Sequence, residues 1–478
     1  MNAPDDASRR WEPLLAQLER VADPAADETV ARIVGTWDAL PSDTDAQTLR
    51  TTHGEQWKRL AQATALLSNL GPNGSLANWQ AQAPDVDPDV AQAVQDYVRA
   101  QQALPAWADI AKLQRAETLF IDHGPLSCIL LFCASLPECY VLPDLATVLH
   151  RAGQLEQRTE YRIRSTAAMI FPVMMRGGLS DASGTGRSQI LKVRLIHATI
   201  RNLILHGDPQ DAYGTPDAAG PKTVPAHPAL ADTPGMHAAM FAAGWDVGRS
   251  GLPCDQEELA YTLLTFSYVF LRSMRRLGLG LAAADEEAYL HCWNVTASVL
   301  GVNDALMAHT MDEAQALLAM MQARARGPVD GPDPRPALGQ ALMRAMENSI
   351  PIGWLKPFAP LMTRYLCGSG TATLIGVNDR ASPVARVLFE LTLSLTRLID
   401  TLARRVWPQF SLSRLFTRIL GYHLITQLLM DQTRSLRLPT HLMAHADAML
   451  DQWSEDAHAP GWVNALEDRL TTSGSWRN

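Results

Sequence analysis

The chain has 478 residues, and 47% of them are hydrophobic, which is enough apolar material to bury a large core. Its 50 aspartates and glutamates outnumber its 41 lysines and arginines, giving a formal net charge of -9. This balance argues against a basic surface that would bind nucleic acid or an anionic membrane.

The N-terminal sequence lacks an apolar stretch of the kind that directs export. Arg9 and Arg10 are followed by charged and polar residues, so we expect no export signal. The most apolar uncharged run covers residues 124–137, which is shorter than the roughly 20 residues that cross a bilayer. We therefore expect no transmembrane segment and a cytoplasmic location.

The six cysteines lie in apolar segments without paired spacing. This arrangement favours reduced, buried thiols over a disulfide framework. None of them begins a C-x-x-C-H sequence, which excludes covalent attachment of a c-type haem. The six are Cys128, Cys133, Cys139, Cys254, Cys292 and Cys367.

Helical periodicity extends over most of the chain. Apolar residues recur three and four positions apart from Trp11 to Trp453, whereas sustained strand-like alternation is hard to find. This pattern predicts an all-α fold. Polar stretches rich in glycine and proline at residues 71–89, 207–235 and 327–336 predict loops between helices.

No change in composition along the chain demands a separate domain. We expect a helical N-terminal extension over residues 1–100 and one large helical core over residues 101–378. A C-terminal helical region over residues 379–478 is expected to pack on that core.

A polar ladder marks the segment at residues 156–179, which predicts a helix closed by Gly177 and Gly178. Within it Arg158, Arg162 and Thr166 are four residues apart and stack on one face, leading from charged surface into an apolar run. An arginine and a hydroxyl placed beside a bound ligand donate hydrogen bonds to negative charge that develops on oxygen. The alternative is an amphipathic helix with solvated arginines.

The segment at residues 186–205 predicts a second helix, on which Val193, Ile196, Ile200, Leu203 and Ile204 form one apolar stripe. His197 lies on this stripe, and a neutral imidazole on a dry, apolar face is the arrangement that a haem iron ligand requires. Arg201, one turn later, needs an anion, either a haem propionate or an acidic side chain. The alternative is a hydrogen-bonded core histidine beside an arginine that extends to the surface.

Three segments of the chain carry a resemblance to a known family. They are KVRLIHATIR at residues 192–201, the R-x-x-x-T pair of Arg162 and Thr166, and the stretch at residues 244–306 with its blocks LLTFS, RRLG and AYLHCWNV. In this order they resemble the latex clearing proteins, which are rubber oxygenases, and related haem proteins that include the mycophenolic-acid side-chain oxygenase. The similarity extends over residues 107–376.

The resemblance implies a globin-like helical pocket for non-covalently bound haem b. It matches His197 to the family's axial iron ligand and Arg201 to its pocket arginine, and it matches Arg162 and Thr166 to residues on the distal side, where dioxygen binds. The implied reaction is cleavage of a carbon-carbon double bond in an isoprenoid or another hydrophobic alkene by dioxygen. The implied partners are therefore dioxygen and a hydrophobic small-molecule or polymer substrate.

Departures from the family bear on the chemistry. Rubber oxygenases have a lysine immediately before the distal threonine, where this chain has Ser165, so ligation of iron by a lysine is not expected. Glu138 and Glu156 are both imperfectly spaced candidates for the family's catalytic glutamate, which leaves the acid or base unassigned. Those oxygenases are exported, and no export signal is expected here, so a small intracellular lipid or isoprenoid is at least as plausible a substrate as rubber.

Several alternatives stay open. His291 and Trp293 belong to the resemblance, and we expect them to pack and hydrogen-bond in the core. Residues 126–136 form either an apolar channel or a buried helix. Two other functions remain, a haem-binding sensor or carrier without oxygenase activity and a haem-free helical binding protein. A di-iron enzyme is disfavoured because the chain has no pair of Glu-x-x-His motifs.

Overall fold

The computed structural model describes residues 3–81, 85–153, 155–213, 220–231, 235–325, 333–350, 356–377 and 382–403, and the single positions 233, 353, 461 and 465. Side chains are described over these ranges apart from residues 3–10, 152–153, 155–158, 160–162, 397 and 401–403. In this part of the chain the fold is mainly helical, as the sequence predicted.

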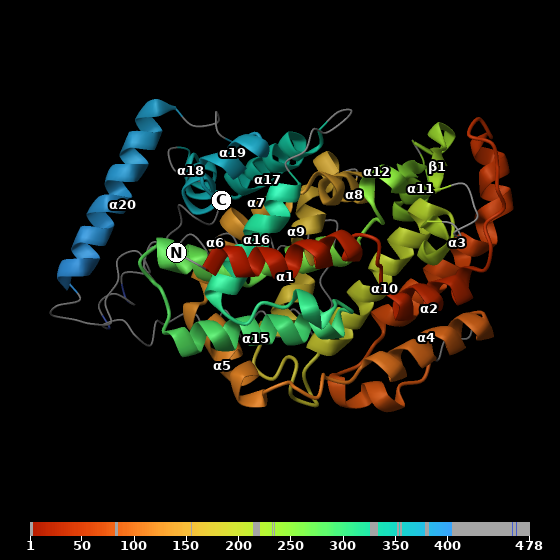
Figure 1. Cartoon of the computed structure of the whole chain (residues 1–478), viewed down its shortest axis with the longest axis horizontal. Helices are drawn as coiled ribbons and strands as arrows, with labels where there is room; N and C mark the ends of the chain where they lie inside the picture. The colour runs from red at the N-terminus through yellow and green to blue at the C-terminus, as the bar shows by residue number, and fades with distance from the viewer. Residues whose placement is uncertain are drawn as a thin grey trace.

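The N-terminal region consists of α1 (Ala3–Leu18), α2 (Pro24–Val34), α3 (Ala46–Ser68), η1 (Asn73–Asn78) and α4 (Pro88–Gln101) (Figure 1). Asp23, Asp45 and Asp87 begin the three helices α2, α3 and α4, because each side chain accepts hydrogen bonds from backbone N–H groups of the first turn. Helix α2 packs against α3, α4 and the central helix α10.

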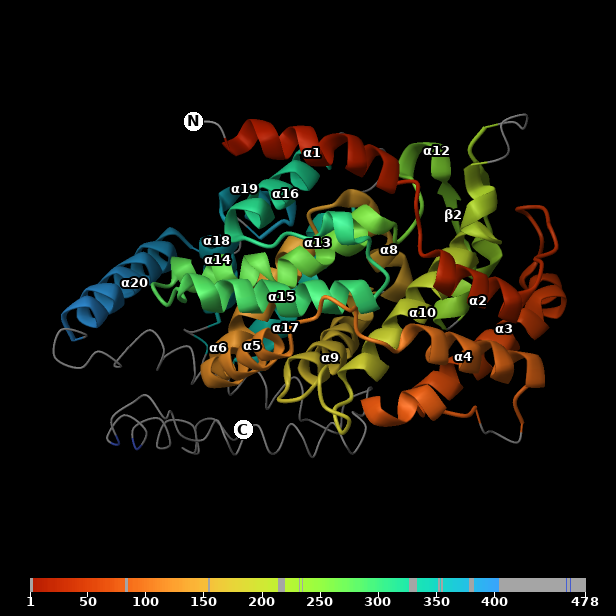
Figure 2. The same cartoon turned by 60° about the horizontal axis from the view of Figure 1, so that its bottom comes forward.

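The middle of the chain contains the two helices of interest, α9 (Leu155–Met174) and α10 (Gly186–Leu205), which pack against each other in the centre of the molecule (Figures 1 and 2). They follow α5 (Ile110–His123), α6 (Pro125–Leu130), a π-helical turn η2 (Leu131–Ser135), α7 (Leu136–Cys139) and α8 (Pro143–Gly153). Every residue from 125 to 139 is buried, so this apolar segment is a buried helix.

After α10 the chain forms η3 (Pro209–Tyr213), β1 (Thr223–Ala226), η4 (Pro228–Leu230), α11 (Met236–Phe241), β2 (Ala243–Asp246) and α12 (Val247–Ser250). The two strands pair antiparallel, with Val224 opposite Trp245. The remaining helices are α13 (Gln256–Phe266), α14 (Tyr268–Arg276), α15 (Ala283–Val299), η5 (Asp304–Leu306), α16 (Met311–Arg324), α17 (Arg335–Ser349), α18 (Phe358–Cys367), α19 (Ser369–Leu374) and α20 (Pro383–Ala403).

One hydrophobic cluster extends through these elements, from Trp11 in α1 to Val377 after α19. The N-terminal helices therefore share their core with the helices around α10. All six cysteines are buried and none of them forms a disulfide, as predicted. Within the described ranges no single helix is long and apolar enough to span a bilayer, although α5 and the α6–α7 segment, bent by 91°, reach that length and composition together.

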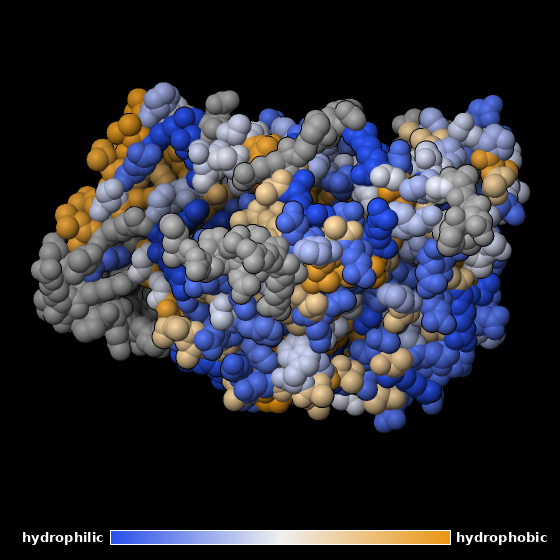
Figure 3. All heavy atoms as spheres, in the orientation of Figure 1, coloured by the Kyte–Doolittle hydropathy of each residue, from blue (hydrophilic) through white to orange (hydrophobic). Residues whose placement is uncertain are grey.

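Helix α20 presents an apolar face to solvent, visible in Figure 3 at the edge of the molecule. The exposed side chains on it are Val384, Val387, Leu388, Leu391, Leu395 and Leu398. Most of the predicted C-terminal region lies beyond this helix and outside the described residues.

Candidate functional site

A tight glycine turn fixes α9 relative to α10. Helix α9 ends at Met174 rather than at Leu179, because the chain turns at Gly177, whose φ of 73° belongs to the left-handed region. A β-carbon at Gly184 would lie 2.1 Å from the carbonyl oxygen of Gly177, so only glycine permits this approach. Asn73 fastens the turn, since its Nδ2 donates to Gly178 O at 2.8 Å.

Helix α10 carries the predicted ligand, His197, and its bounds are those that the sequence predicted. Burial lowers the pKa of His197 to about 4, and the positive charge of Arg201 contributes in the same direction. The imidazole is therefore neutral at pH 7. Its Nδ1 is buried without a hydrogen-bond partner. The alternative, a hydrogen-bonded core histidine, does not hold for this atom.

Two buried ion pairs lie one turn to either side of His197. Arg194 binds Asp23 through two contacts, Nε to Oδ2 at 2.5 Å and Nη2 to Oδ1 at 2.8 Å. Arg201 donates from Nε to Asp27 Oδ1 at 2.8 Å. Both aspartates come from the beginning of α2, so the N-terminal region supplies the counterions of the histidine-bearing face.

Arg201 is fully buried, with 0% of its surface exposed, so the alternative that it extends to the surface is wrong. Its anion is an acidic side chain, Asp27, and its Nη1 also donates to the carbonyl oxygen of Cys254 at 2.6 Å. Burial raises the pKa of Asp27 to about 6 despite the opposing charge of Arg201. These contacts hold the guanidinium in place beside His197.

The polar ladder on α9 is described only in part. Thr166 is half-buried on the helix that packs against α10, and Ser165 is exposed. The side chains of Arg158 and Arg162, and that of Glu156, lie outside the described residues. Among the described side chains of α9, Arg164 is a buried arginine, with 1% exposure, and it lies outside the predicted ladder.

The candidate acid or base Glu138 is held in a polar network. It is 1% exposed, and its Oε1 accepts from Arg272 at 2.6 Å. Its Oε2 accepts from Gln322 at 2.9 Å and from Thr371 at 3.3 Å. These contacts satisfy both carboxylate oxygens, which favours a role in fastening helices.

Glu117 on α5 is another buried carboxyl group, and no sequence pattern pointed to it. Its Oε2 accepts from the backbone of Gly177 at 2.8 Å, and its Oε1 has no partner. Burial raises its pKa to about 7. It therefore braces the same glycine turn that joins α9 to α10.

The residues His291 and Trp293 of α15 pack largely as expected. His291 Nε2 accepts from the backbone N–H of Asp109 at 2.8 Å and contacts Trp107 edge-on. Trp293 is buried and stacks on Phe266, but its Nε1 has no hydrogen-bond partner, so the expected hydrogen bond of this residue is missing.

Comparison with known proteins places these helices in a family. Residues 128–398 match the model of the catalytic domain described as ER-bound oxygenase mpaB/B'/Rubber oxygenase. A rubber oxygenase of Streptomyces sp. strain K30 is 23% identical over 288 residues, which cover 59% of this chain and 60% of that protein. The match therefore spans less than two thirds of the relative's length.

A solved structure has a similar fold. The latex clearing protein LCP in the closed state superposes with a TM-score of 0.54 at 20% sequence identity, covering 91% of this chain and 90% of that one. At this identity the likeness concerns the arrangement of the helices. It covers more of the chain than the residues matched by the family model.

Proposed function

The chain belongs to the family of mpaB-type and rubber oxygenases, and on that premise we propose that it is a haem-dependent oxygenase that cleaves a carbon-carbon double bond of a hydrophobic alkene. In this proposal haem b binds without covalent links, and His197 is its axial ligand. Dioxygen is the second substrate.

The observation that carries the proposal is the unsatisfied nitrogen of His197. A buried polar atom without a partner is rare in native proteins, because it loses its hydrogen bonds to water. A bond between the neutral imidazole and a metal would satisfy it. The described residues contain no group of three or more histidine, cysteine or acidic side chains placed to hold a metal ion. A metal at His197 would therefore need donors from a cofactor, and a porphyrin supplies four.

Helices α10 and α9 also carry apolar side chains that are only partly buried. Ile196 and Val193 on α10, and Met169 and Phe171 on α9, are packed against the core yet only partly buried. Together they offer apolar surface on the two facing helices. A haem and a hydrophobic substrate would both cover such surface, with a gain of about 25 cal/mol for each Å² removed from water.

Each residue has a separate task in this proposal. When bound, haem supplies the activation of dioxygen. Burial, with a smaller contribution from the charge of Arg201, lowers the pKa of His197 and so keeps it neutral and able to act as a ligand. Asp27 holds Arg201 in position. Thr166 offers a hydroxyl that can donate a hydrogen bond to an oxygen atom as it gains negative charge. The resemblance gives Arg162 the same task.

The test is an absorption spectrum of the purified full-length protein after reconstitution with haemin. We expect a Soret band in the wild-type protein and its loss in His197→Ala. The matched control is His309→Ala, which removes an exposed histidine and should keep the band. An unchanged band in His197→Ala would refute the ligand assignment. A second assay distinguishes an oxygenase from a haem carrier. Only an oxygenase forms carbonyl products when the haem-loaded protein is incubated with squalene and oxygen.

A further inference from the structure

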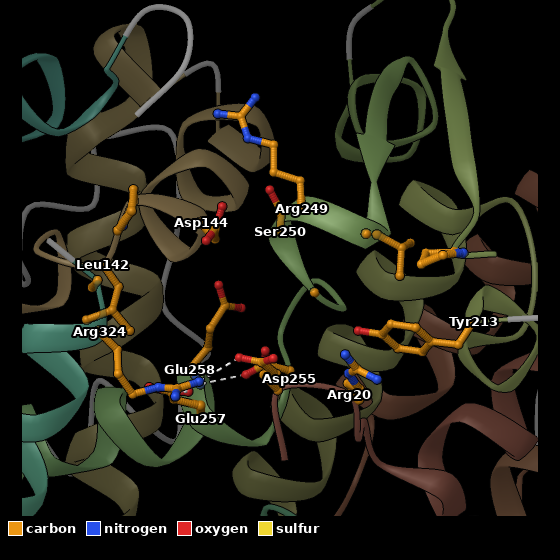
Figure 4. A pocket seen from close by; sticks show the side chains of 17 residues that line it. Arg20, Leu142, Asp144, Tyr213, Arg249, Ser250, Asp255, Glu257, Glu258 and Arg324 are labelled. Atoms are coloured by element: carbon orange, nitrogen blue, oxygen red, sulfur yellow. Dashed lines mark hydrogen bonds and ion pairs between the residues drawn. The ribbon is translucent and has the colours of Figure 1, made fainter. Parts of the chain in front are cut away.

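A polar cavity of about 300 Å³ lies where six elements meet. They are the end of α1, the start of α8, the end of η3, the short helix α12, the start of α13 and the end of α16 (Figure 4). Arg201 and Cys254 lie between this cavity and His197, because Arg201 Nη1 donates to Cys254 O and Cys254 N donates to Glu258 in the cavity wall. The cavity is therefore distinct from the site described above.

Acidic side chains dominate the wall. Five carboxylates and three arginines line it. One of the arginines, Arg324, is shared between two of the carboxylates, binding Glu19 at 2.6 Å and Glu257 at 3.1 Å. The other two arginines, Arg20 and Arg249, are exposed at the rim. The interior of the cavity therefore has an excess of negative groups.

Glu258 is the group that points to a ligand. It is 5% exposed, and its carboxylate points into the cavity toward Asp144 (Figure 4). Its Oε2 accepts a hydrogen bond from the backbone of Cys254 at 2.7 Å, whereas its Oε1 is buried and has no partner in the protein. A buried carboxylate oxygen without a donor is strongly unfavourable unless a cation or a proton satisfies it.

We propose that this cavity binds a small organic cation, an ammonium or guanidinium group on a short apolar stem, with Glu258 Oε1 as its acceptor. Asp144 and Asp255 reinforce the negative field around the bound charge. Leu142 and Val247 in the wall provide apolar contact for the stem.

Two other ligand classes fit less well. The described residues hold no group of three acidic, histidine or cysteine side chains placed to coordinate a metal ion. The volume of about 300 Å³ also exceeds that of a single ion and lies at the lower end of the range for small-molecule sites. An anion would meet the carboxyl groups of Asp144, Asp255 and Glu258, and like charges repel at such distances.

The backbone explains why Glu258 stays in this position. Cys254 has a φ of 54°, in the left-handed region that residues other than glycine rarely adopt. This conformation is held by the hydrogen bonds on both sides of Cys254, from its N–H to Glu258 and from Arg201 to its carbonyl oxygen. Asp255 caps α13 by accepting from Glu258 N at 2.8 Å. The acceptor is therefore preorganised for its ligand.

The experiment is isothermal titration calorimetry of the full-length protein with n-butylammonium chloride at constant ionic strength and about pH 9. Burial raises the pKa of Glu258 to about 8, so its carboxyl group is ionised under these conditions, while butylammonium keeps its charge. Sodium butyrate and 1-butanol are the anionic and neutral controls with the same stem length. We expect saturable binding of butylammonium at one site and none of the two controls. Glu258→Gln should weaken the binding by about tenfold or more, since it replaces a charge-assisted hydrogen bond with a neutral amide.

Glu55→Gln is the matched control variant. It changes the net charge of the protein by the same amount at an exposed position of α3, and we expect its affinity for butylammonium to stay within about twofold of wild type. Thermal unfolding of each variant confirms that it is folded. Absence of butylammonium binding at millimolar concentrations, equal binding of 1-butanol, or equal affinity in Glu258→Gln would each overturn the proposal. None of these readouts requires haem or oxygenase activity.

Discussion

The pair between Arg201 and Asp27 offers a direct test of how the N-terminal region supports α10. Both side chains are buried, with 0% and 3% of their side-chain surface exposed. Asp27→Asn keeps the shape of the side chain but removes its charge, which leaves the guanidinium of Arg201 without a counterion inside the protein. Breaking a buried pair in this way costs about 3–5 kcal/mol.

The control for this variant is an ion pair of the same chemistry at the surface. Arg32 and Asp96 lie 2.8 Å apart with 49% and 46% of their side-chain surface exposed, and such pairs contribute about 0–1 kcal/mol. Urea denaturation followed by far-UV circular dichroism gives the free energy of unfolding of Asp27→Asn and Asp96→Asn. An equal loss in the free energy of unfolding of the two variants would show that the buried pair does not stabilise the packing of α10.

Two further predictions concern the glycine turn and the cavity. Gly184→Ala should destabilise the protein or prevent folding, because its β-carbon would lie 2.1 Å from a carbonyl oxygen. Gly54→Ala in α3, where nothing lies within 4 Å of the new atom, should instead stabilise the protein by up to about 1 kcal/mol. Thermal unfolding measures the stability of both variants. Burial raises the pKa of Glu258 from 4.5 to about 8, so the folded state holds more protons than the unfolded state between these values. Stability should therefore fall as pH rises through this window, by up to about 1.4 kcal/mol per pH unit, and Glu258→Gln should flatten the slope in urea denaturation.

Local structure could be predicted from the sequence wherever the hydrophobic periodicity was strong. Residues 186–205 predicted α10 with its observed bounds, because the apolar stripe and the flanking glycine and polar residues agree. The same stripe placed His197 among apolar side chains, although His197, Val193 and Ile196 are only partly buried. The end of α9 was predicted too late, at Leu179 rather than Met174, because close backbone approach at the turn depends on tertiary contacts with Asn73 and Glu117.

Partners distant in the sequence could not be predicted. Asp23 and Asp27 are 171 and 174 residues from the arginines that they bind, and no local pattern connects them. Arg194 could have been noticed, because it precedes Arg201 by seven residues and therefore lies on the same helix face. The cavity around Glu258 likewise depends on six elements that are separated in the sequence.

These contacts change how the first hundred residues relate to the site. A buried arginine is tolerated only with an anion beside it, and both anions of the His197 face come from the start of α2. The charge of Arg201 in turn contributes to the lowered pKa of His197. Helix α2 therefore acts on the imidazole through Arg201, although it lies outside the segment that matches the family model. Exchanging this segment between relatives would leave Arg194 and Arg201 buried without counterions unless the two aspartates were carried with it.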